Sequence, residues 1–411
     1  MLIPSIDLFN GQAVQWRQGR EHVLARDDVF DLLESFSLFG EVAVIDLNAA
    51  TGKGNNGSLI EEMLKRHPCR VGGGIRDLET ARHYLKVGAT KIILGTAARE
   101  PWVRKLPKEA LIFALDAKGD EWLSHGWKKN TGLNTLQVLE DLSPFCSEVL
   151  YTQVEKEGMM AGLDRPRITQ LVNQSPIQVT VAGGVTTTDD VAFLHQLGAK
   201  AQIGMALYTG KLSLQDALLA CLDFKKSSLI PTIVQDIASH QILMLAYSSP
   251  ESLKLALSER KGIYFSRSRQ ELWRKGETSG NSQELCQVDW DCDGDSLIFK
   301  VRQKGPACHF SRYSCFSRVE PRFSLTSLDT VLEQRQKTLP EGSFTAKLFN
   351  SVDLQNEKLR EETEELIEAE NFADARWEAA DLLYFTLVKA RAMGVGLEDI
   401  VAELRSRHGN S

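Results

Sequence analysis

The sequence predicts three domains of different fold class: a parallel (β/α)8 barrel, a small mostly β or α+β domain, and an all-α domain. Its 411 residues are enough for two or three domains of ordinary size. Short apolar runs alternate with amphipathic stretches over residues 1–222, whereas apolar residues recur at every second position over 232–320. Over 344–408 they recur at every third or fourth position, which is typical of amphipathic helices.

The barrel prediction rests on eight apolar segments in the first 222 residues. Continuously apolar strands need helices on their outer face, as in a parallel barrel. The segments are LIPSID, EVAVIDL, CRVGGGI, KIILGT, LIFALDA, EVLYTQV, IQVTVAGGV and AQIGM. The segment at 71–95 recurs at 181–204, and the segment at 3–7 recurs at 112–116, so the barrel is predicted to consist of two fused halves.

Two breaks in these patterns predict the domain boundaries. Charged residues, two serines and Pro231 interrupt the pattern at 223–231, so the barrel is assigned to 1–222 and the second domain to 225–320. A second connection at 321–329, one helix and a loop at 338–343 then lead to an all-α domain assigned to 339–411.

Composition restricts the partners. Residues 341–411 hold 15 acidic and 8 basic residues and the rest of the chain holds 40 of each, so no basic patch for nucleic acid is expected. No apolar run reaches the ~18 residues of a membrane helix, and the N-terminal MLIPSIDLF has no basic region. With an odd seven cysteines and no disulfide framework, we expect a cytosolic protein without membrane partners.

Asp7 and Asp116 are the candidate acid and base of the barrel. They end the first and fifth predicted strands, which face each other across a barrel, so their carboxylates would flank one small molecule. The alternative is that each merely caps the following loop. Because the internal repeat relates the two positions, a functional pair is favoured.

Glycines follow four of the predicted strands. Glycine lets backbone N–H groups approach a phosphate closely, and a helix N-terminus adds its dipole. Two such loops related by the repeat predict a ligand with a phosphate at each end. The candidate phosphate-binding residues are Gly73, Gly74, Gly95, Thr96, Gly183, Gly184 and Gly204.

Residues 1–222 contain the motifs IPSIDL, VIDL, GGGIR, LDAKG, GW, YTxxEKEG, AGGV and ALYTGK. With these motifs the segment resembles the ribotide isomerase of histidine biosynthesis, a TIM-barrel enzyme. The resemblance implies an Amadori rearrangement without a cofactor, with Asp7 as base, Asp116 as acid and Thr152 assisting. The chain departs from the family where it has Ala43 for His, Gln153 for an acidic residue and Met205 for Arg. An active isomerase and a retained, inactive scaffold both remain open.

The second domain contains candidate metal ligands. If Asp291, Asp293 and Asp295 lie on a strand, they share one face and offer the hard oxygens that Mg²⁺ prefers. Three thiolates suit a zinc ion that keeps one position open for water. Alternatives are a solvated edge strand, a structural zinc site with His309 as fourth ligand, and, less favoured, a nucleic-acid zinc ribbon. The candidate zinc ligands are Cys292, Cys308 and Cys315.

Residues 265–281 crowd basic, hydroxyl and glycine groups that could meet a phosphate. Residues 229–318 contain the motifs SRSRxxLWxKGETSGN, DCDGD, GPxCH and SC. With these motifs the segment resembles phosphoribosyl-AMP cyclohydrolase. The resemblance implies that zinc-bound hydroxide opens the adenine ring, with His309 as proton shuttle, Mg²⁺ on the aspartates, and a homodimer that shares its site between subunits. The substrate-binding candidates are Arg267, Arg269, Trp273, Lys275, Thr278 and Ser279.

Acidic residues at helical spacing mark the last domain. Two antiparallel helices could bring these acidic residues together. Because like charges repel, the cluster would need a cation, and Mg²⁺ that bridges a di- or triphosphate is the expected ligand. A solvated acidic face is the alternative, although the second pair lies among apolar residues. The candidates are Glu361, Glu362, Glu365, Glu378 and Asp381, of which the last four are the candidate Mg²⁺ ligands.

The pattern EExxE, 12 residues, ExxD resembles the MazG-like pyrophosphohydrolases, and SFTAKL, EAADLLYF and ELRSRH resemble phosphoribosyl-ATP pyrophosphohydrolase. Lys347 is a candidate phosphate contact, and Arg360 stands where the family usually has glycine. The leading hypothesis is a multifunctional histidine-biosynthesis enzyme, a hydrolase and isomerase acting on phosphoribosyl nucleotides. The alternatives are a bifunctional hydrolase with an inactive barrel and a nucleotide-binding regulatory protein.

Overall fold

The computed structural model describes residues 2–17, 19, 21–124, 127, 129–316 and 323–407. The described residues divide into two compact units, of which the first holds most of 2–316 and the second most of 323–401. No helix in these ranges is both long and apolar enough to cross a membrane.

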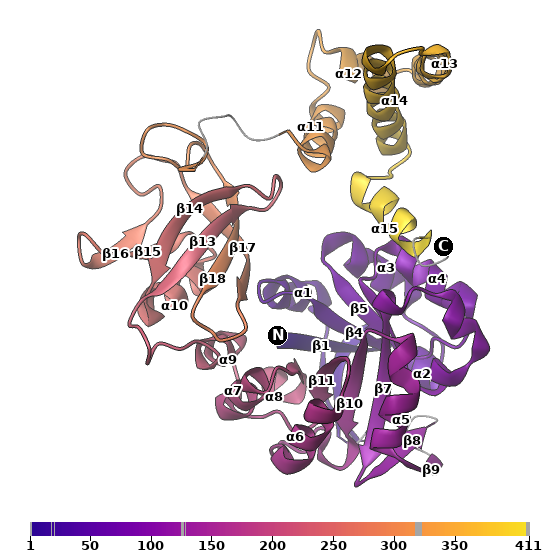
Figure 1. Cartoon of the computed structure of the whole chain (residues 1–411), viewed down its shortest axis with the longest axis vertical. Coiled ribbons are helices and arrows are strands. Elements are labelled where there is room, and N and C mark those ends of the chain that lie inside the picture. The colour runs from indigo at the N-terminus through magenta and orange to yellow at the C-terminus, as the bar shows by residue number, and fades with distance from the viewer. Residues whose placement is uncertain are drawn as a thin grey trace. The chain divides into compact units, whose positions relative to one another are not determined.

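Eight parallel strands close into a barrel at the start of the chain (Figure 1). The first strand pairs with the second on one side and with the eighth on the other, and the pairing of β7 with β10 completes the ring. The (β/α)8 prediction is therefore confirmed. The strands are β1 (Leu2–Phe9), β4 (Val42–Asp46), β5 (Cys69–Gly72), β6 (Lys91–Leu94), β7 (Leu111–Lys118), β10 (Glu148–Gln153), β11 (Gln178–Ala182) and β12 (Lys200–Ile203).

Helices cover the outside of the barrel (Figure 1). Two that the internal repeat relates begin with similar caps, Asp77 before α4 and Thr187 before α7. The α-helices are α1 (Val29–Ser37), α2 (Leu47–Thr51), α3 (Gly57–Arg66), α4 (Leu78–Val87), α5 (Thr135–Leu142), α6 (Arg165–Gln174), α7 (Thr188–Gln196), α8 (Met205–Tyr208) and α9 (Leu214–Ala220). Short 3-10 helices are η1 (Thr96–Arg99), η2 (Pro101–Lys105), η3 (Lys108–Ala110), η4 (Ser143–Phe145) and η5 (Val154–Lys156).

Antiparallel strands extend the two repeat-related strands β1 and β7. β2 (Gln12–Arg17) pairs with β1 and β3 (Glu21–Arg26), and β8 (Glu121–Ser124) pairs with β7 and β9 (Lys129–Asn134). The repeat thus includes an extension after the strand that carries each candidate aspartate.

A buried ionic group lies at the opposite, N-terminal ends of the strands. Arg70 and Glu148 have no exposed surface, and their side chains approach to 2.5 Å. Lys200 and Lys91 reach the other carboxylate oxygen of Glu148 at 2.8 and 3.1 Å. Burial alone would raise the pKa of Glu148, but these three cations lower it to about 2.

The second domain is a four-stranded sheet with one helix and a small hairpin, as the α+β prediction requires. The sheet order is β14 (Ile242–Ser248), β13 (Ile230–Asp236), β18 (Leu297–Gln303) and β17 (Gln283–Trp290), and the other elements are α10 (Pro250–Glu259), β15 (Ile263–Ser266) and β16 (Glu271–Arg274). It belongs to the same compact unit as the barrel. Val288 N–H donates to Leu38 O at 2.9 Å, and Arg260 pairs with Glu34 at 2.6 Å.

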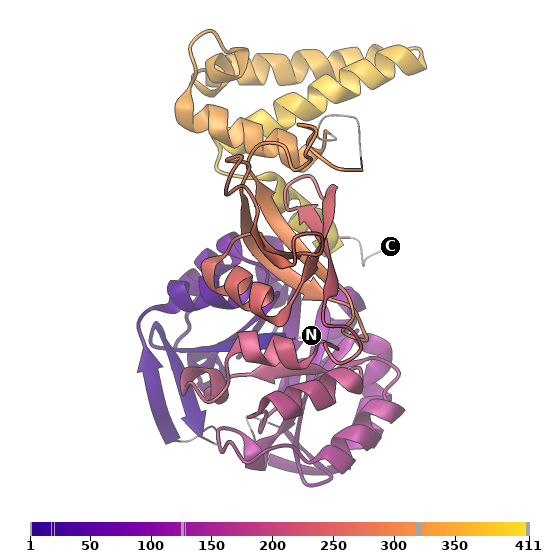
Figure 2. The same cartoon turned by 90° about the vertical axis from the view of Figure 1, so that its left-hand side faces the viewer.

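The C-terminal region is helical, as predicted. Figure 2 shows the two longest helices, α13 and α14, lying side by side. α11 packs on the same apolar core through Leu332, and its Asp329 pairs with Arg391 of α14, so this helix, ahead of the boundary expected at 339, belongs to the helical domain. The helices are α11 (Leu325–Thr338), α12 (Phe344–Phe349), α13 (Val352–Glu368), α14 (Phe372–Ala392) and α15 (Leu397–Arg407).

Candidate active sites and metal centres

The two candidate aspartates of the barrel lie near the carboxyl ends of β1 and β7. Ser5 Oγ donates to Asp7 Oδ1 at 2.8 Å. Asp116 is hydrogen-bonded by Trp127 and by Thr152, its register partner on β10. Loss of solvent raises the pKa of each carboxyl to about 6, although these hydrogen bonds oppose the shift. Both groups are therefore placed to exchange protons near neutral pH.

A third carboxyl, Glu157, is near the same two aspartates and was not among the predicted residues. It follows η5, and its Oε2 lies 3.0 Å from the position that a Cβ on Gly183 would take. Loss of solvent, together with the charges of Asp7 and Asp116, raises its pKa to about 8. At pH 7 this carboxyl holds its proton while the two aspartates are mostly ionised, so the site contains both a donor and acceptors.

The glycine loops after β5 and β11 have the backbone geometry that only glycine adopts without strain. A Cβ on Gly73 would lie 2.3 Å from Asp46 O, and a Cβ on Gly183 would lie 2.7 Å from Gln153 O. The loops therefore leave backbone groups, and not side chains, beside the neighbouring strand ends. The glycines with positive φ here are Gly73, Gly74, Gly183 and Gly184.

Gly95 with Thr96, and Gly204, follow β6 and β12 as expected, each before a short helical turn. The side chain of Gln15, on β2, lies over the second of these loops and is also a residue that was not predicted. Its Oε1 is 2.9 Å from the Cβ position of Gly204, and its Nε2 has no hydrogen-bond partner among the described residues. An unpaired buried amide is costly, so an oxygen of a ligand or water beside Gly204 would stabilise it.

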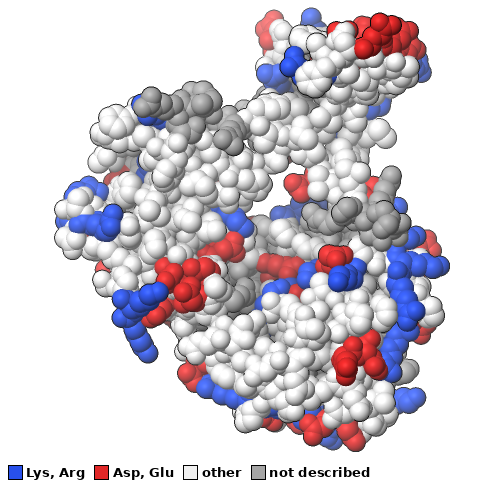
Figure 3. All heavy atoms as spheres, viewed as in Figure 1, with Lys and Arg blue, Asp and Glu red and all other residues white. Residues whose placement is uncertain are grey.

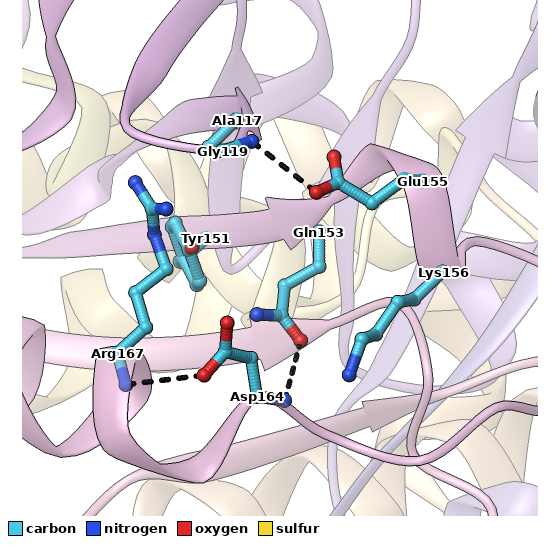
Figure 4. A pocket seen from close by; sticks show the side chains of 8 residues that line it. All are labelled: Ala117, Gly119, Tyr151, Gln153, Glu155, Lys156, Asp164 and Arg167. Carbon is cyan, nitrogen blue, oxygen red and sulfur yellow. Dashed lines mark hydrogen bonds between the residues drawn. The ribbon is translucent and has the colours of Figure 1, made fainter.

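Gln153, which replaces a frequent acidic residue, lines a small pocket beside β10 (Figure 4). Its Oε1 accepts from Asp164 N–H at 3.2 Å, and Glu155 accepts from Gly119 N–H across the pocket at 3.2 Å. The volume of about 50 Å³ is room for water molecules and not for a nucleotide. In this structure the pocket is therefore too small to hold a nucleotide.

Two of the three candidate zinc ligands come together in the second domain. The Cys308 and Cys315 thiols interact directly, and a backbone hydrogen bond from Phe310 lowers the pKa of Cys308. Cys315 N–H donates to Leu243 O at 2.8 Å, which fixes the loop to β14. Cys292 does not join them, because no three cysteines among the described residues have sulfurs within 4.8 Å of one another. His309 is exposed beside the pair.

The three aspartates Asp291, Asp293 and Asp295 lie in the turn between β17 and β18, so their assignment to a strand was wrong. Their carboxylate oxygens nevertheless lie within 4.8 Å of one another. Gly294 has φ +72°, and Asp291 Oδ1 accepts from the N–H groups of Asp295 and Ser296 at 3.0 and 3.1 Å. A turn closed by its own first side chain, and not strand alternation, gathers these hard oxygen donors, which fit Mg²⁺.

The predicted substrate-binding residues occupy the β15–β16 hairpin and the loop after it. The Arg267 guanidinium stacks 3.7 Å from the Tyr247 ring centroid, and Trp273 packs on Tyr264. Arg269 is exposed and pairs with Glu271 at 3.2 Å. Thr278 and Ser279 are both exposed.

Lys275 is the basic residue of this segment that faces the cysteine pair. It is partly buried, loss of solvent lowers its pKa, and the Cys315 and Cys308 thiolates oppose that shift. Arg274, in contrast, is held by both oxygens of Glu259 at 2.5 and 2.8 Å. The two basic residues line a groove of about 700 Å³, large enough for a nucleotide.

In the helical domain, α13 and α14 bring together three of the predicted carboxylates, Glu362, Glu365 and Glu378, within 4.8 Å. Figure 3 shows acidic side chains gathered over these helices. Loss of solvent and the neighbouring Asp381 raise the pKa of Glu362. Glu361 instead pairs with Lys358 at 2.6 Å. Lys347 is exposed on α12.

Three family models match successive parts of the chain. The model described as histidine biosynthesis protein matches residues 1–213, more than half of the chain. The chain belongs to this family. The phosphoribosyl-AMP cyclohydrolase model matches 244–317, and the phosphoribosyl-ATP pyrophosphohydrolase model matches 325–408. The cysteine pair and the aspartate turn thus lie in a cyclohydrolase domain, and the glutamate cluster lies in a pyrophosphohydrolase domain.

Curated relatives that are named as histidine biosynthesis proteins match slightly less than half of the chain. The bifunctional protein HisIE of Bacillus subtilis is 43% identical over 198 residues, covering 46% of this chain and 95% of that protein. HisIE of Thermus thermophilus is 39% identical, with 46% and 94% covered. The histidine biosynthesis trifunctional protein of Kluyveromyces lactis is 46% identical over 186 residues, but the match spans only 23% of its length.

Proposed function

We propose that the chain catalyses consecutive steps of histidine biosynthesis. The helical domain hydrolyses phosphoribosyl-ATP to phosphoribosyl-AMP and pyrophosphate, the second domain opens the adenine ring, and the barrel isomerises the product. The observation that carries the proposal is the presence of all three domain families in one chain. The product of each step is the substrate of the next. We assign residues 1–222 and 225–320 to the first two domains and place the start of the third at α11.

In the pyrophosphohydrolase domain, Glu362, Glu365 and Glu378 would hold Mg²⁺, with Asp381 beside them. When bound, the ion would supply positive charge that offsets the negative charge of the phosphates. Glu361 pairs with Lys358, which also lies 3.8 Å from Glu362 of the cluster. Lys347 would contact phosphate from α12.

In the cyclohydrolase domain, Cys308 and Cys315 would hold Zn²⁺ together with Cys292 of a second copy. When bound, zinc would supply a hydroxide nucleophile near neutral pH. His309 would move the proton, and Lys275 would bind the substrate phosphate beside the thiols. The Asp291–Asp293–Asp295 turn would hold Mg²⁺. Separation of Cys292 from the pair within one chain supports the second copy.

Exposed apolar side chains on the helical pair also support a homodimer. Ile367, Phe372 and Trp377 are 78%, 82% and 66% exposed. Large apolar side chains that are left uncovered on neighbouring helices are typical of an interface.

All seven cysteines are free thiols, which supports a reducing compartment, the cytosol, as the place of action.

In the barrel, Asp7 would take the proton from the substrate carbon. Glu157, which holds a proton at pH 7, is a candidate acid beside Asp116. Thr152 positions Asp116 through its hydrogen bond. The glycine loops would bind the two phosphates, and the reaction needs no cofactor.

A scaffold role for the barrel is the second candidate. The contacts of Val288 with Leu38 and of Arg260 with Glu34 favour it, because they fix the cyclohydrolase domain to barrel residues. Complementation of three bacterial strains, each lacking one of the three steps, separates the two. Rescue of all three supports the full proposal, and rescue of only the two hydrolase strains supports the scaffold. Rescue of none by a well-expressed protein would refute both.

Cys308→Ser provides the residue-level test of the cyclohydrolase site. The variant should lose bound zinc and ring opening, because the cysteine pair is broken, and should still release pyrophosphate from phosphoribosyl-ATP. Zinc content and the two activities are measured on the same preparation. Equal loss of both activities would mean that zinc holds the fold together and does not act in catalysis.

A further inference from the structure

A lysine side chain of the same protein lies next to the turn formed by Asp291, Asp293 and Asp295 in the cyclohydrolase domain. Lys226 Nζ lies 2.5 Å from Asp295 Oδ2. Lys226 is in the connection between the barrel helix α9 and the first strand of the second domain, β13. In Figure 3, basic side chains lie beside an acidic group near α9.

Backbone hydrogen bonds fix the connection against the turn itself. Asp223 N–H donates to Gly294 O at 2.8 Å, and Lys226 N–H donates to Asp223 Oδ1 at 3.0 Å. A Cβ on Gly294 would lie 2.1 Å from Cys221 O, so the end of the barrel touches the turn with no room for a side chain. These contacts fix the backbone of Lys226 beside the turn, so less backbone entropy is lost when its side chain, which is 61% exposed, pairs with Asp295.

The three carboxylates are not equally available to a metal ion. Asp291 Oδ1 is used by two backbone N–H groups, and Asp295 Oδ2 is used by Lys226, whereas Asp293 is exposed. A divalent ion that takes one oxygen from each aspartate gains from all three negative charges only if the ammonium group moves away.

We propose that Lys226 occupies the cation position beside Asp295 in the metal-free protein and competes there with the divalent ion. This inference rests on the proposed metal role of the aspartate turn. It makes the barrel connection a determinant of the metal affinity of the cyclohydrolase domain.

The test measures Mn²⁺ binding to the full-length, zinc-replete protein by electron paramagnetic resonance of the free ion. All proteins carry Glu362→Gln and Glu378→Gln, so that the glutamate cluster does not contribute. Lys226→Met is compared with Lys225→Met, which removes the same charge from the neighbouring exposed position. We expect Lys226→Met to bind Mn²⁺ about threefold to tenfold more tightly than Lys225→Met, since a contacting positive charge is lost.

Asp293→Asn in the same background separates the two possible failures. If it leaves Mn²⁺ binding unchanged, the turn is not a metal site and the proposed function is wrong at this point. If it weakens Mn²⁺ binding but Lys226→Met binds no more tightly than Lys225→Met, the site stands and the competition is refuted. Weaker binding by Lys226→Met would mean that the lysine positions Asp295 for the ion.

Discussion

Two carboxyl groups of the barrel, nine positions apart in the chain, have opposite electrostatic surroundings. Glu148 begins β10 and is surrounded by Arg70, Lys200 and Lys91, so its pKa falls to about 2. Glu157 follows the other end of the same strand, where its charged neighbours are Asp7 and Asp116, and its pKa rises to about 8. Burial acts in the same direction on both groups, so the charges nearby decide the outcome.

The difference separates stabilising residues from reactive ones within one strand. At the N-terminal ends of the strands each buried charge is paired, which suits a permanent structural contact. Around the carboxyl ends, Asp7, Asp116 and Glu157 have no buried cation beside them among the described residues, so at least one of them keeps its proton. Such a site is costly to fold but able to transfer protons.

The largest expected effect is on catalysis at the acidic end. Asp7→Asn should lower the isomerase rate by about 100-fold to 10,000-fold, because the amide cannot accept a proton from the substrate. Stability at pH 7 should not fall, because the amide replaces a buried carboxylate whose ionised form is disfavoured in the folded protein. The rate is measured on the isolated aminoaldose substrate. An undiminished rate in Asp7→Asn would remove the base from the proposed mechanism.

Glu148→Gln should have the largest effect on stability. It removes the carboxylate that Arg70 shares with two lysines and leaves Arg70 paired with Glu41 alone, a loss of about 3 kcal/mol in the free energy of unfolding. Denaturant unfolding at pH 7 measures it. The wild-type contribution should be complete above pH 4.5 and should disappear as the pH falls toward 2, because only the unfolded state takes up the proton in that window.

The pH dependence of the isomerase should follow the raised values. kcat/KM is expected to rise as Asp7 ionises near pH 6 and to fall as Glu157 loses its proton near pH 8. Glu157→Gln should lack the alkaline decline. A decline that persists near pH 8 in this variant would show that the acid is a group other than Glu157.

The smallest expected effect is the change in the free energy of unfolding that Glu157→Gln causes. Between pH 4.5 and 8 the folded protein binds a proton that the unfolded chain has released, so wild-type stability should fall as the pH rises through this window. The neutral amide removes that dependence. At pH 8 the variant should therefore be more stable than the wild type by about 1 kcal/mol, after allowance for solvent at the site. Paired denaturant curves at pH 5 and pH 8 measure the change, and destabilisation at both would contradict the comparison.

Much of the fold could be predicted because its signals are local and repeated. Continuously apolar strands and the duplicated glycine-containing motifs indicate the barrel. Apolar residues at every second position indicate the sheet of the second domain. The assignment of α11 could not be made this way. Its packing depends on Leu332 in a distant core and on the pairing of Asp329 with Arg391, 62 positions later.

The candidate sites were predictable where motif and geometry coincide, as for the Glu362–Glu365–Glu378 group at helical spacing. Prediction was weaker where tertiary contacts create the property. Glu157 is set apart by its two acidic neighbours and Gln15 by an unpaired amide, and neither feature has a sequence signature. The clustering of Asp291, Asp293 and Asp295 was predicted from strand alternation, but a turn closed by the Asp291 side chain produces it. Such a turn also brings alternate residues together.

The pairing of β1 with β12 joins segments about 200 positions apart. Until the last barrel strand has been synthesised, both β1 and its growing partner sheet have open edges, which are prone to association with other chains. Closure can occur as soon as residue 203 is free of the ribosome, before the cyclohydrolase sequence is complete. Ribosome-bound chains that stop just before β12 should therefore be more dependent on chaperones than chains that extend past it.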